Sequence, residues 1–115
     1  MAFFMHQWTY KDPHIREMIT KPSDRAEIVR VATEAFGGTL HQFFLAFGDY
    51  DGVAISEFPD ATTALACMMS VYGQGGLGSL KTTLLIPSDQ GKLAMELAQN
   101  VLRGAAPPAD PTTTA

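Results

Sequence analysis

Apolar and aromatic residues gather in four short runs, each followed closely by a Gly, Pro or Asp. Runs this short, rich in aromatic and β-branched residues, are more typical of buried strands than of helices. The pattern predicts strands at 2–10, 39–47, 53–58 and 79–86.

The connections between these runs differ in character. Gly48-Asp49-Tyr50-Asp51-Gly52 joins the second and third runs, and because Gly and Asp tolerate the backbone angles of tight loops, it predicts a hairpin. Asp12-Pro13-His14 ends the first run, and we expect a loop from there through Lys21-Pro22.

Two segments have apolar residues at helical spacing and a capping residue at their start. Glu27 follows Asp24 at the distance of a capping box, although Ser23 is an equally suitable cap, and Gly37-Gly38 ends this helix. Asp60 is the expected cap of the second helix. The apolar stripe of the second helix consists of Ala61, Ala64, Leu65, Met68 and Tyr72.

The resulting order, β-α-β-β-α-β, predicts an α+β ferredoxin-like domain over residues 1–86. We expect a four-stranded antiparallel sheet in the order 4-1-3-2, with both helices on one face. Residues 87–104 predict an appended C-terminal helix, and the Pro-, Thr- and Ala-rich stretch 105–115 predicts a flexible tail.

The amino-acid composition favours some classes of binding partner and argues against others. Only 17% of the residues are charged, against about 25% in an average soluble domain, so some apolar surface is expected to meet another subunit. The net charge is −4 and the basic residues are scattered, which argues against nucleic acid. The single cysteine, Cys67, is expected to be buried in a reducing compartment. Without a leader pattern or a membrane-spanning run, we expect a cytoplasmic protein that does not enter membranes.

The hairpin segment, continued as Val53-Ala54-Ile55-Ser56-Glu57-Phe58-Pro59-Asp60, resembles the signature of the GYD domain family of small bacterial proteins. Three further segments agree with that family: Trp8-Thr9, Gly37-Gly38 and Leu77-Gly78-Ser79-Leu80-Lys81-Thr82. The resemblance covers roughly Phe3 to Ile86 and leaves out the third helix and the tail. The chain departs from the family pattern at Lys81, where Arg is expected, and at His6, where an aliphatic residue is expected.

The resemblance implies a ferredoxin-like fold related to dimeric α/β-barrel proteins, in which two sheets face each other across a subunit interface. It implies no settled activity. A sheet covered by helices on one face leaves an aromatic-rich face bare, so a homodimer or higher homo-oligomer is expected independently of the family. We expect a ligand cavity beside the sheet.

His6 and His41 are the candidate catalytic residues, because histidine is readily poised for acid-base chemistry near neutral pH. The simpler interpretation, which the pattern favours for each, is an ordinary core or surface histidine. Alternation does not establish that the two share a face. The candidate ligand-binding residues are Trp8, Tyr10, Phe43, Tyr50 and Lys81.

The glycine-rich segment and the hairpin aspartates do not indicate a catalytic or binding site. A phosphate-binding loop runs from a strand to a helix and has Lys directly after its last Gly. The Gly73–Gly78 segment runs from a helix to a strand, and Lys81 comes three positions after Gly78, so it is not such a loop. Asp49 and Asp51 are better explained by turn formation than by acid-base work, and Tyr50 by packing. No metal-ligand spacing and no cofactor motif is present, so we expect neither a metal nor a cofactor.

Two functions remain open. One is a cofactor-independent enzyme that oxidises, cyclises or isomerises a small apolar or aromatic molecule. The other is a non-catalytic binding or assembly module, which the appended helix and tail favour slightly because neither belongs to the core motif.

Overall fold

The computed structural model describes residues 1–104. Its strands are β1 (Ala2–Tyr10), β2 (Thr39–Leu45), β3 (Gly52–Phe58) and β4 (Leu77–Leu85). Its helices are α1 (Asp12–Thr20), α2 (Arg25–Ala35), α3 (Ala61–Tyr72) and α4 (Ser88–Leu102). The four predicted strands are confirmed, with small shifts at their ends.

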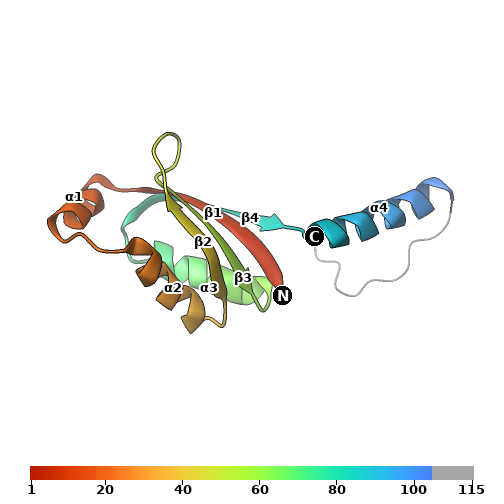
Figure 1. The fold of residues 1–115 in the computed structure, drawn as a ribbon, viewed down its shortest axis with the longest axis horizontal. Coiled ribbons are helices and arrows are strands. Elements are labelled where there is room, and N and C mark those ends of the chain that lie inside the picture. Colours follow the sequence, from red (N-terminus) through yellow and green to blue (C-terminus); the bar gives the residue numbers. More distant parts are fainter. Residues whose placement is uncertain (105–115) are drawn as a thin grey trace. The chain divides into compact units, whose positions relative to one another are not determined.

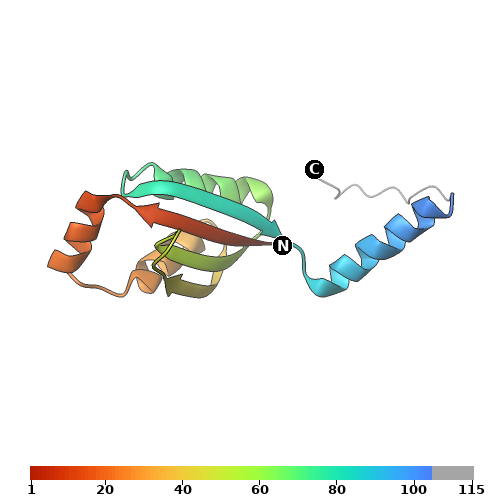
Figure 2. The same ribbon diagram turned by 90° about the horizontal axis from the view of Figure 1, so that it is seen from above.

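The strands form one antiparallel sheet in the order β2-β3-β1-β4, as predicted (Figure 1). The central strand β1 pairs with β3 from Ala2↔Phe58 to Trp8↔Gly52. It also lies beside β4 along its length (Figure 2). Helices α2 and α3 cover one face, and no helix of residues 1–85 covers the other, which we call the open face (Figure 1). The ferredoxin-like prediction is therefore confirmed.

Helix α1 is the main error of the sequence analysis, because a loop was predicted where Asp12–Thr20 is helical. Pro13 follows the end of the first strand and lies in the first turn of α1. There its missing N–H removes no helical hydrogen bond and its fixed φ suits the helix. Proline at this position starts the helix rather than preventing it.

The predicted helix caps are confirmed by their hydrogen bonds. The Asp24 carboxylate accepts from the Ala26 N–H, so Asp24, not Ser23, caps α2. The Asp60 carboxylate accepts from the Thr63 N–H at 2.8 Å and caps α3. These short side chains satisfy helix N–H groups that have no partner within the helix.

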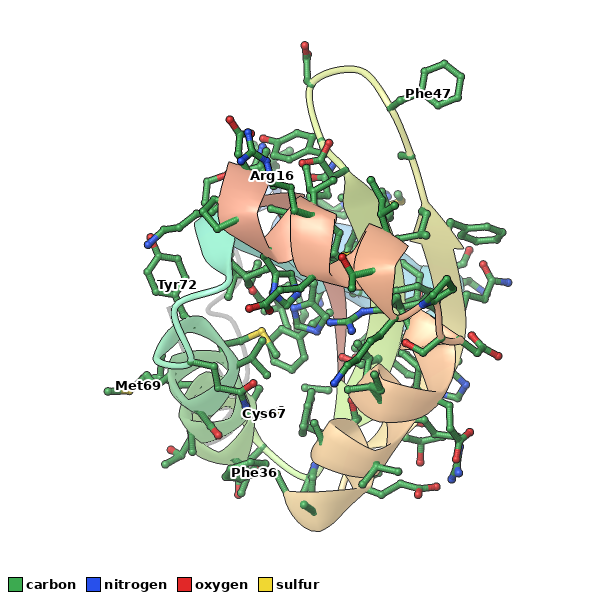
Figure 3. The ribbon with its side chains drawn as sticks, turned by 90° about the vertical axis from the view of Figure 1, so that its left-hand side faces the viewer. Arg16, Phe36, Phe47, Cys67, Met69 and Tyr72 are labelled. Atoms are coloured by element: carbon green, nitrogen blue, oxygen red, sulfur yellow. The ribbon has the colours of Figure 1, made fainter. Side chains whose placement is uncertain are left out.

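The apolar stripe predicted for α3 is partly wrong. Ala64 is buried as expected, but Leu65 and Tyr72 are exposed and the buried face instead includes Cys67. Figure 3 shows Cys67 turned toward the interior and Tyr72 turned away from it. The helix is apolar on both sides, so spacing alone did not identify the inner one. The main core cluster consists of Phe4, Phe58, Ala64 and Cys67.

The hairpin between β2 and β3 is confirmed. Gly48 has a φ of 138°, which side-chain-bearing residues rarely adopt, and the Ala46 N–H donates to the Asp51 carbonyl. The Asp51 carboxylate accepts from the Tyr10 N–H at 2.8 Å, so it fixes the hairpin to β1 rather than serving only its own turn. Phe47, at the tip, is fully exposed (Figure 3).

The chain divides into two compact units, residues 1–85 and a second that begins at Ile86. The second unit contains α4, the appended helix predicted from the sequence, and no residue of α4 is buried. The predicted tail, 105–115, lies outside the described residues. No helix within residues 1–104 has the length and apolarity that crossing a bilayer requires.

Candidate functional site

A cavity of about 280 Å³ lies between the sheet and helices α2 and α3. Residues of α1 line it as well, and Figure 3 looks toward this end of the domain, with α1 in front. Much of the lining is apolar or aromatic and includes Trp8, Tyr10, Val29, Leu40, Leu77 and Leu80. Small-molecule sites typically measure about 300–1,000 Å³, so this cavity suits a small ligand.

Strand alternation directs His6 and Trp8 into the helix-covered side. Along β1, Phe4, His6 and Trp8 are buried, while Met5 and Gln7 alternate with them. Successive side chains of a strand point to opposite faces, so the central strand supplies both the polar floor of the cavity and part of its aromatic wall.

His6 is held by two hydroxyl groups from the neighbouring strands. Its Nε2 lies 2.6 Å from Ser56 Oγ on β3, and its Nδ1 lies 3.0 Å from Thr82 Oγ1 on β4. A hydroxyl can donate or accept, so this pair satisfies either neutral tautomer of the imidazole. Burial lowers the pKa of His6 from 6.5 to about 4, because the charged ring would lose its hydration. His6 is therefore neutral at pH 7, and one of its ring nitrogens carries no proton.

Trp8 lies flat against β3 because its neighbour there is glycine. A Cβ at Gly52 would stand 2.2 Å from Trp8 Cζ2, closer than any two carbon atoms can pack. Phe43 packs against the indole at a ring-centroid distance of 5.5 Å, and Tyr10 meets it edge-on. The last glycine of the hairpin motif thus makes room for the aromatic wall.

The open face holds the other candidate histidine. His41 Nε2 lies 3.0 Å from Glu57 Oε1, and the His41 ring stacks on Phe3 at 5.6 Å. Phe3 precedes the buried Phe4 on β1, so His41 and His6 lie on opposite faces of the sheet. The structure does not bring the two candidate catalytic histidines together in one cavity.

The candidate ligand-binding residues are likewise divided. Trp8 and Tyr10 line the cavity. Phe43 is not part of the lining but packs against the Trp8 ring. Lys81 pairs in register with Gln7, on the open face, and Tyr50 lies in the hairpin loop outside the cavity lining.

Sequence analysis missed a polar group at the α1 end of the cavity. The guanidinium of Arg25, the first residue of α2, donates from Nη2 to His14 Nε2 at 3.0 Å, and the His14 ring packs against Tyr10. Glu17, one turn after His14, also lines the cavity. The sequence predicted a loop at His14, whereas the proline-started helix places His14 and Glu17, three residues apart, on one helical face.

Ser56 was missed as a site residue for a different reason. It was noted only within the hairpin motif, whereas its contact with His6 depends on how β1 and β3 pair. Cys67 is buried as predicted, and burial raises the pKa of its thiol, which disfavours the reactive thiolate. Within residues 1–104, no three His, Cys, Asp or Glu side chains cluster in a way that could hold a metal ion.

Comparison with known proteins agrees with this architecture. The model of the GYD domain family matches residues 4–95, so the match continues into α4, which the sequence analysis had left out. The solved structure titled "crystal structure of FFRP-DM1" is 14% identical with a TM-score of 0.52, covering 75% of this chain and all of the other. A hypothetical protein, PHS023 from Pyrococcus horikoshii, is 13% identical with a TM-score of 0.49, covering 76% of this chain and 92% of the other. No curated protein matches the sequence. At this identity, the first structure supports the fold alone.

Proposed function

The chain belongs to the GYD domain family, and we propose that this member binds a small apolar or aromatic molecule between its sheet and helices. The observation that carries the proposal is the cavity itself: about 280 Å³ of space with an aromatic wall and a neutral histidine in its lining. Protein interiors are otherwise close-packed, with few voids larger than a water molecule. A space of this size beside Trp8 and His6 is therefore suited to a ligand.

We further propose that the protein acts on the ligand without a cofactor, in a cyclisation or isomerisation that includes a proton transfer. The neutral His6 imidazole is the acceptor, and the Ser56 hydroxyl, 2.6 Å from Nε2, can relay a proton from the ligand to it. When Nε2 accepts the proton, the ring becomes an imidazolium, and its Nδ1–H donates to the Thr82 hydroxyl, which keeps the ring oriented.

The alternative is a binding or assembly module that holds the same ligand without turning it over. The hydrogen-bonding of His6 by two hydroxyls is compatible with this role, because a buried histidine with both nitrogens satisfied is a stable structural element. The appended α4 and the exposed apolar residues of α3 provide surface for assembly.

Native mass spectrometry of the purified full-length chain tests ligand binding, since a retained small molecule adds a discrete mass. Trp8 is the only tryptophan, so its fluorescence reports entry of candidate compounds directly. A ligand that shifts Trp8 emission, and loses affinity in a Leu80→Phe variant that narrows the cavity without adding a second tryptophan, supports the site. Absence of retained mass and of any fluorescence response across a broad apolar compound set contradicts it.

His6→Gln separates the enzyme from the module. Glutamine keeps hydrogen-bonding groups for Ser56 and Thr82 but is not a base at neutral pH. If His6 accepts a proton, this variant should bind the ligand and lose at least about 100-fold in turnover, the usual lower range of general acid-base catalysis. His41→Gln, on the open face, should turn over ligand at the wild-type rate. Binding without turnover in the wild-type protein favours the module.

We also propose that the open face forms a homodimer with a second copy. Phe3, Met5, Val53, Ile55 and Phe44 give this face an apolar character, and Phe44 remains 58% exposed. Sedimentation at several concentrations should show a dimer that Ile55→Lys weakens, because the charge would be buried without a partner. A wild-type monomer at high micromolar concentration contradicts the dimer.

A further inference from the structure

We infer that the ligand of this cavity is an acid, and that Arg25 binds its carboxylate. The inference rests on the proposed cavity site and adds the chemical class of its ligand. Its basis is an unmatched positive charge in the cavity lining.

Arg25 is positioned by its own helix. It is the first residue of α2, directly after the cap Asp24, and its side chain lines the cavity together with residues of α1. The half-buried side chain carries a charge whose hydration the surrounding protein reduces. A charge in this setting is costly unless it is paired and hydrogen-bonded.

Within residues 1–104, no carboxylate forms an ion pair with Arg25. Its Nε–H is buried and has no hydrogen-bond partner among these residues. Both other arginines of the first two helices differ in setting: Arg16 is exposed, and Arg30 is paired with Glu27 and Glu34. Arg25 alone among these three combines burial with the lack of an anionic partner.

His14 engages Nη2 of the guanidinium, and the adjacent Nε–H has no partner within residues 1–104. Guanidinium can only donate hydrogen bonds, so the 3.0 Å contact from Nη2 requires His14 Nε2 to accept. The ring hydrogen of a neutral His14 is then on Nδ1, on the side of Glu17, whose Oε2 is 3.7 Å away. The neutral ring accepts one hydrogen bond but supplies no negative charge to balance Arg25.

The free Nε–H belongs to the edge of the guanidinium that, with an Nη, matches the two oxygens of a carboxylate. Arg25 is the only Lys or Arg among the residues that line the cavity, and Glu17 adds a negative charge there. The Glu17 side chain is 81% exposed and does not pair with Arg25, so the single guanidinium suits a ligand with a single negative charge better than a phosphate dianion. The apolar and aromatic lining suits the rest of the molecule. We therefore expect a small aromatic or apolar monocarboxylate.

Paired probes test the charge of the ligand. Benzoate and 1-naphthoate are titrated against the full-length protein, alongside benzamide and 1-naphthamide, which have nearly the same shape without the charge. Trp8 fluorescence and the melting temperature are the readouts. The carboxylates should bind roughly 10- to 100-fold more tightly than the amides, which is the usual value of a charge-assisted hydrogen-bonded pair.

Arg25→Gln should remove that preference, so that carboxylate and amide bind equally. Arg25→Lys keeps the positive charge but lacks the planar guanidinium with its two parallel N–H donors. This variant should retain only part of the preference for carboxylates over amides. Arg16 is an exposed arginine of α1 outside the cavity lining. The control variant Arg16→Gln therefore removes an equal charge and should keep the wild-type preference.

The melting temperature without ligand distinguishes binding from a purely structural role. Arg25→Gln removes a half-buried charge that has no anionic partner, so the unliganded variant should melt no lower than the wild type. Amides that bind as tightly as carboxylates would overturn the acid assignment and leave the cavity proposal standing. Binding of neither probe class, together with no retained ligand, would overturn both. A marked loss of melting temperature in Arg25→Gln with unchanged carboxylate preference would assign Arg25 a structural role and also overturn the inference.

Discussion

The two faces of the sheet hold the same residue type in opposite environments. His6, on the helix-covered face, is 5% exposed, hydrogen-bonded to two hydroxyls, and has its pKa lowered to about 4. His41, on the open face, is exposed and paired with the Glu57 carboxylate. Burial keeps the His6 ring neutral at pH 7, and the two hydroxyls satisfy both of its nitrogens. The environment, not the residue type, therefore determines which histidine is suited to act as a buried base.

The faces also differ in how their apolar residues are covered within one chain. On the helix side, Phe58 is fully buried against Phe4 and α3. On the open side, Phe44 keeps more than half of its surface accessible. One face is completed by its own chain, and the other is completed, in our proposal, by a second copy.

The largest expected effect comes from removing the buried ring. Phe58→Ala should lower the free energy of unfolding by about 3–5 kcal/mol, the usual cost of a large cavity in a core. Phe44→Ala should cost about 0.5 kcal/mol or less under dilute, monomeric conditions and should weaken self-association at higher concentration. Urea unfolding and sedimentation measure the two effects. Equal losses of stability in dilute solution would mean that the faces are not distinct.

A second effect should appear as pH is lowered. The unfolded chain protonates His6 near its ordinary pKa of 6.5, whereas the folded protein resists protonation until about pH 4. Between these values the unfolded state binds more protons, so stability falls as pH falls. The His6 contribution is fully present above pH 6.5, and its loss reaches about 3 kcal/mol near pH 4.

The comparison of two variants isolates that contribution. His6→Gln should abolish the His6 part of the loss, and His41→Gln, which keeps His6, should retain it. Urea unfolding at pH 7, 5.5 and 4.5 gives the free energies. A wild-type pH slope in His6→Gln would show that burial of His6 is not its source.

The smallest expected effect is on the open face. Glu57→Gln removes the charge from the contact with His41, and half-exposed ion pairs of this kind contribute about 0–1 kcal/mol. Thermal unfolding in low and high salt should detect a change no larger than that, and salt should reduce it. A loss of several kcal/mol in the free energy of unfolding would indicate that a second copy of the chain already covers the contact between Glu57 and His41.

Much of the fold was predictable because its signals are local. The aromatic β1 run, the Gly48–Gly52 hairpin and the caps Asp24 and Asp60 each depend on neighbouring residues, and the structure confirms them. Helix α1 was missed although its signal was also local, since Pro13 permits a first turn as readily as it ends a strand. That error hid the polar group of the cavity, because His14 and Glu17 lie on α1.

The sequence by itself determined the strand order, the hairpin and the helix caps. It also determined that one sheet has a histidine on β1 and another on β2, the two strands that flank β3. Only the tertiary structure decided which face each histidine occupies, because a bulge near His41 shifts the register between β2 and β3. It also decided that Ser56 and Thr82 hold His6 and that Arg25 meets His14, contacts that join separate elements of the chain. Local propensities act within a few residues, whereas a cavity and the charge in its lining exist only after distant elements have packed together.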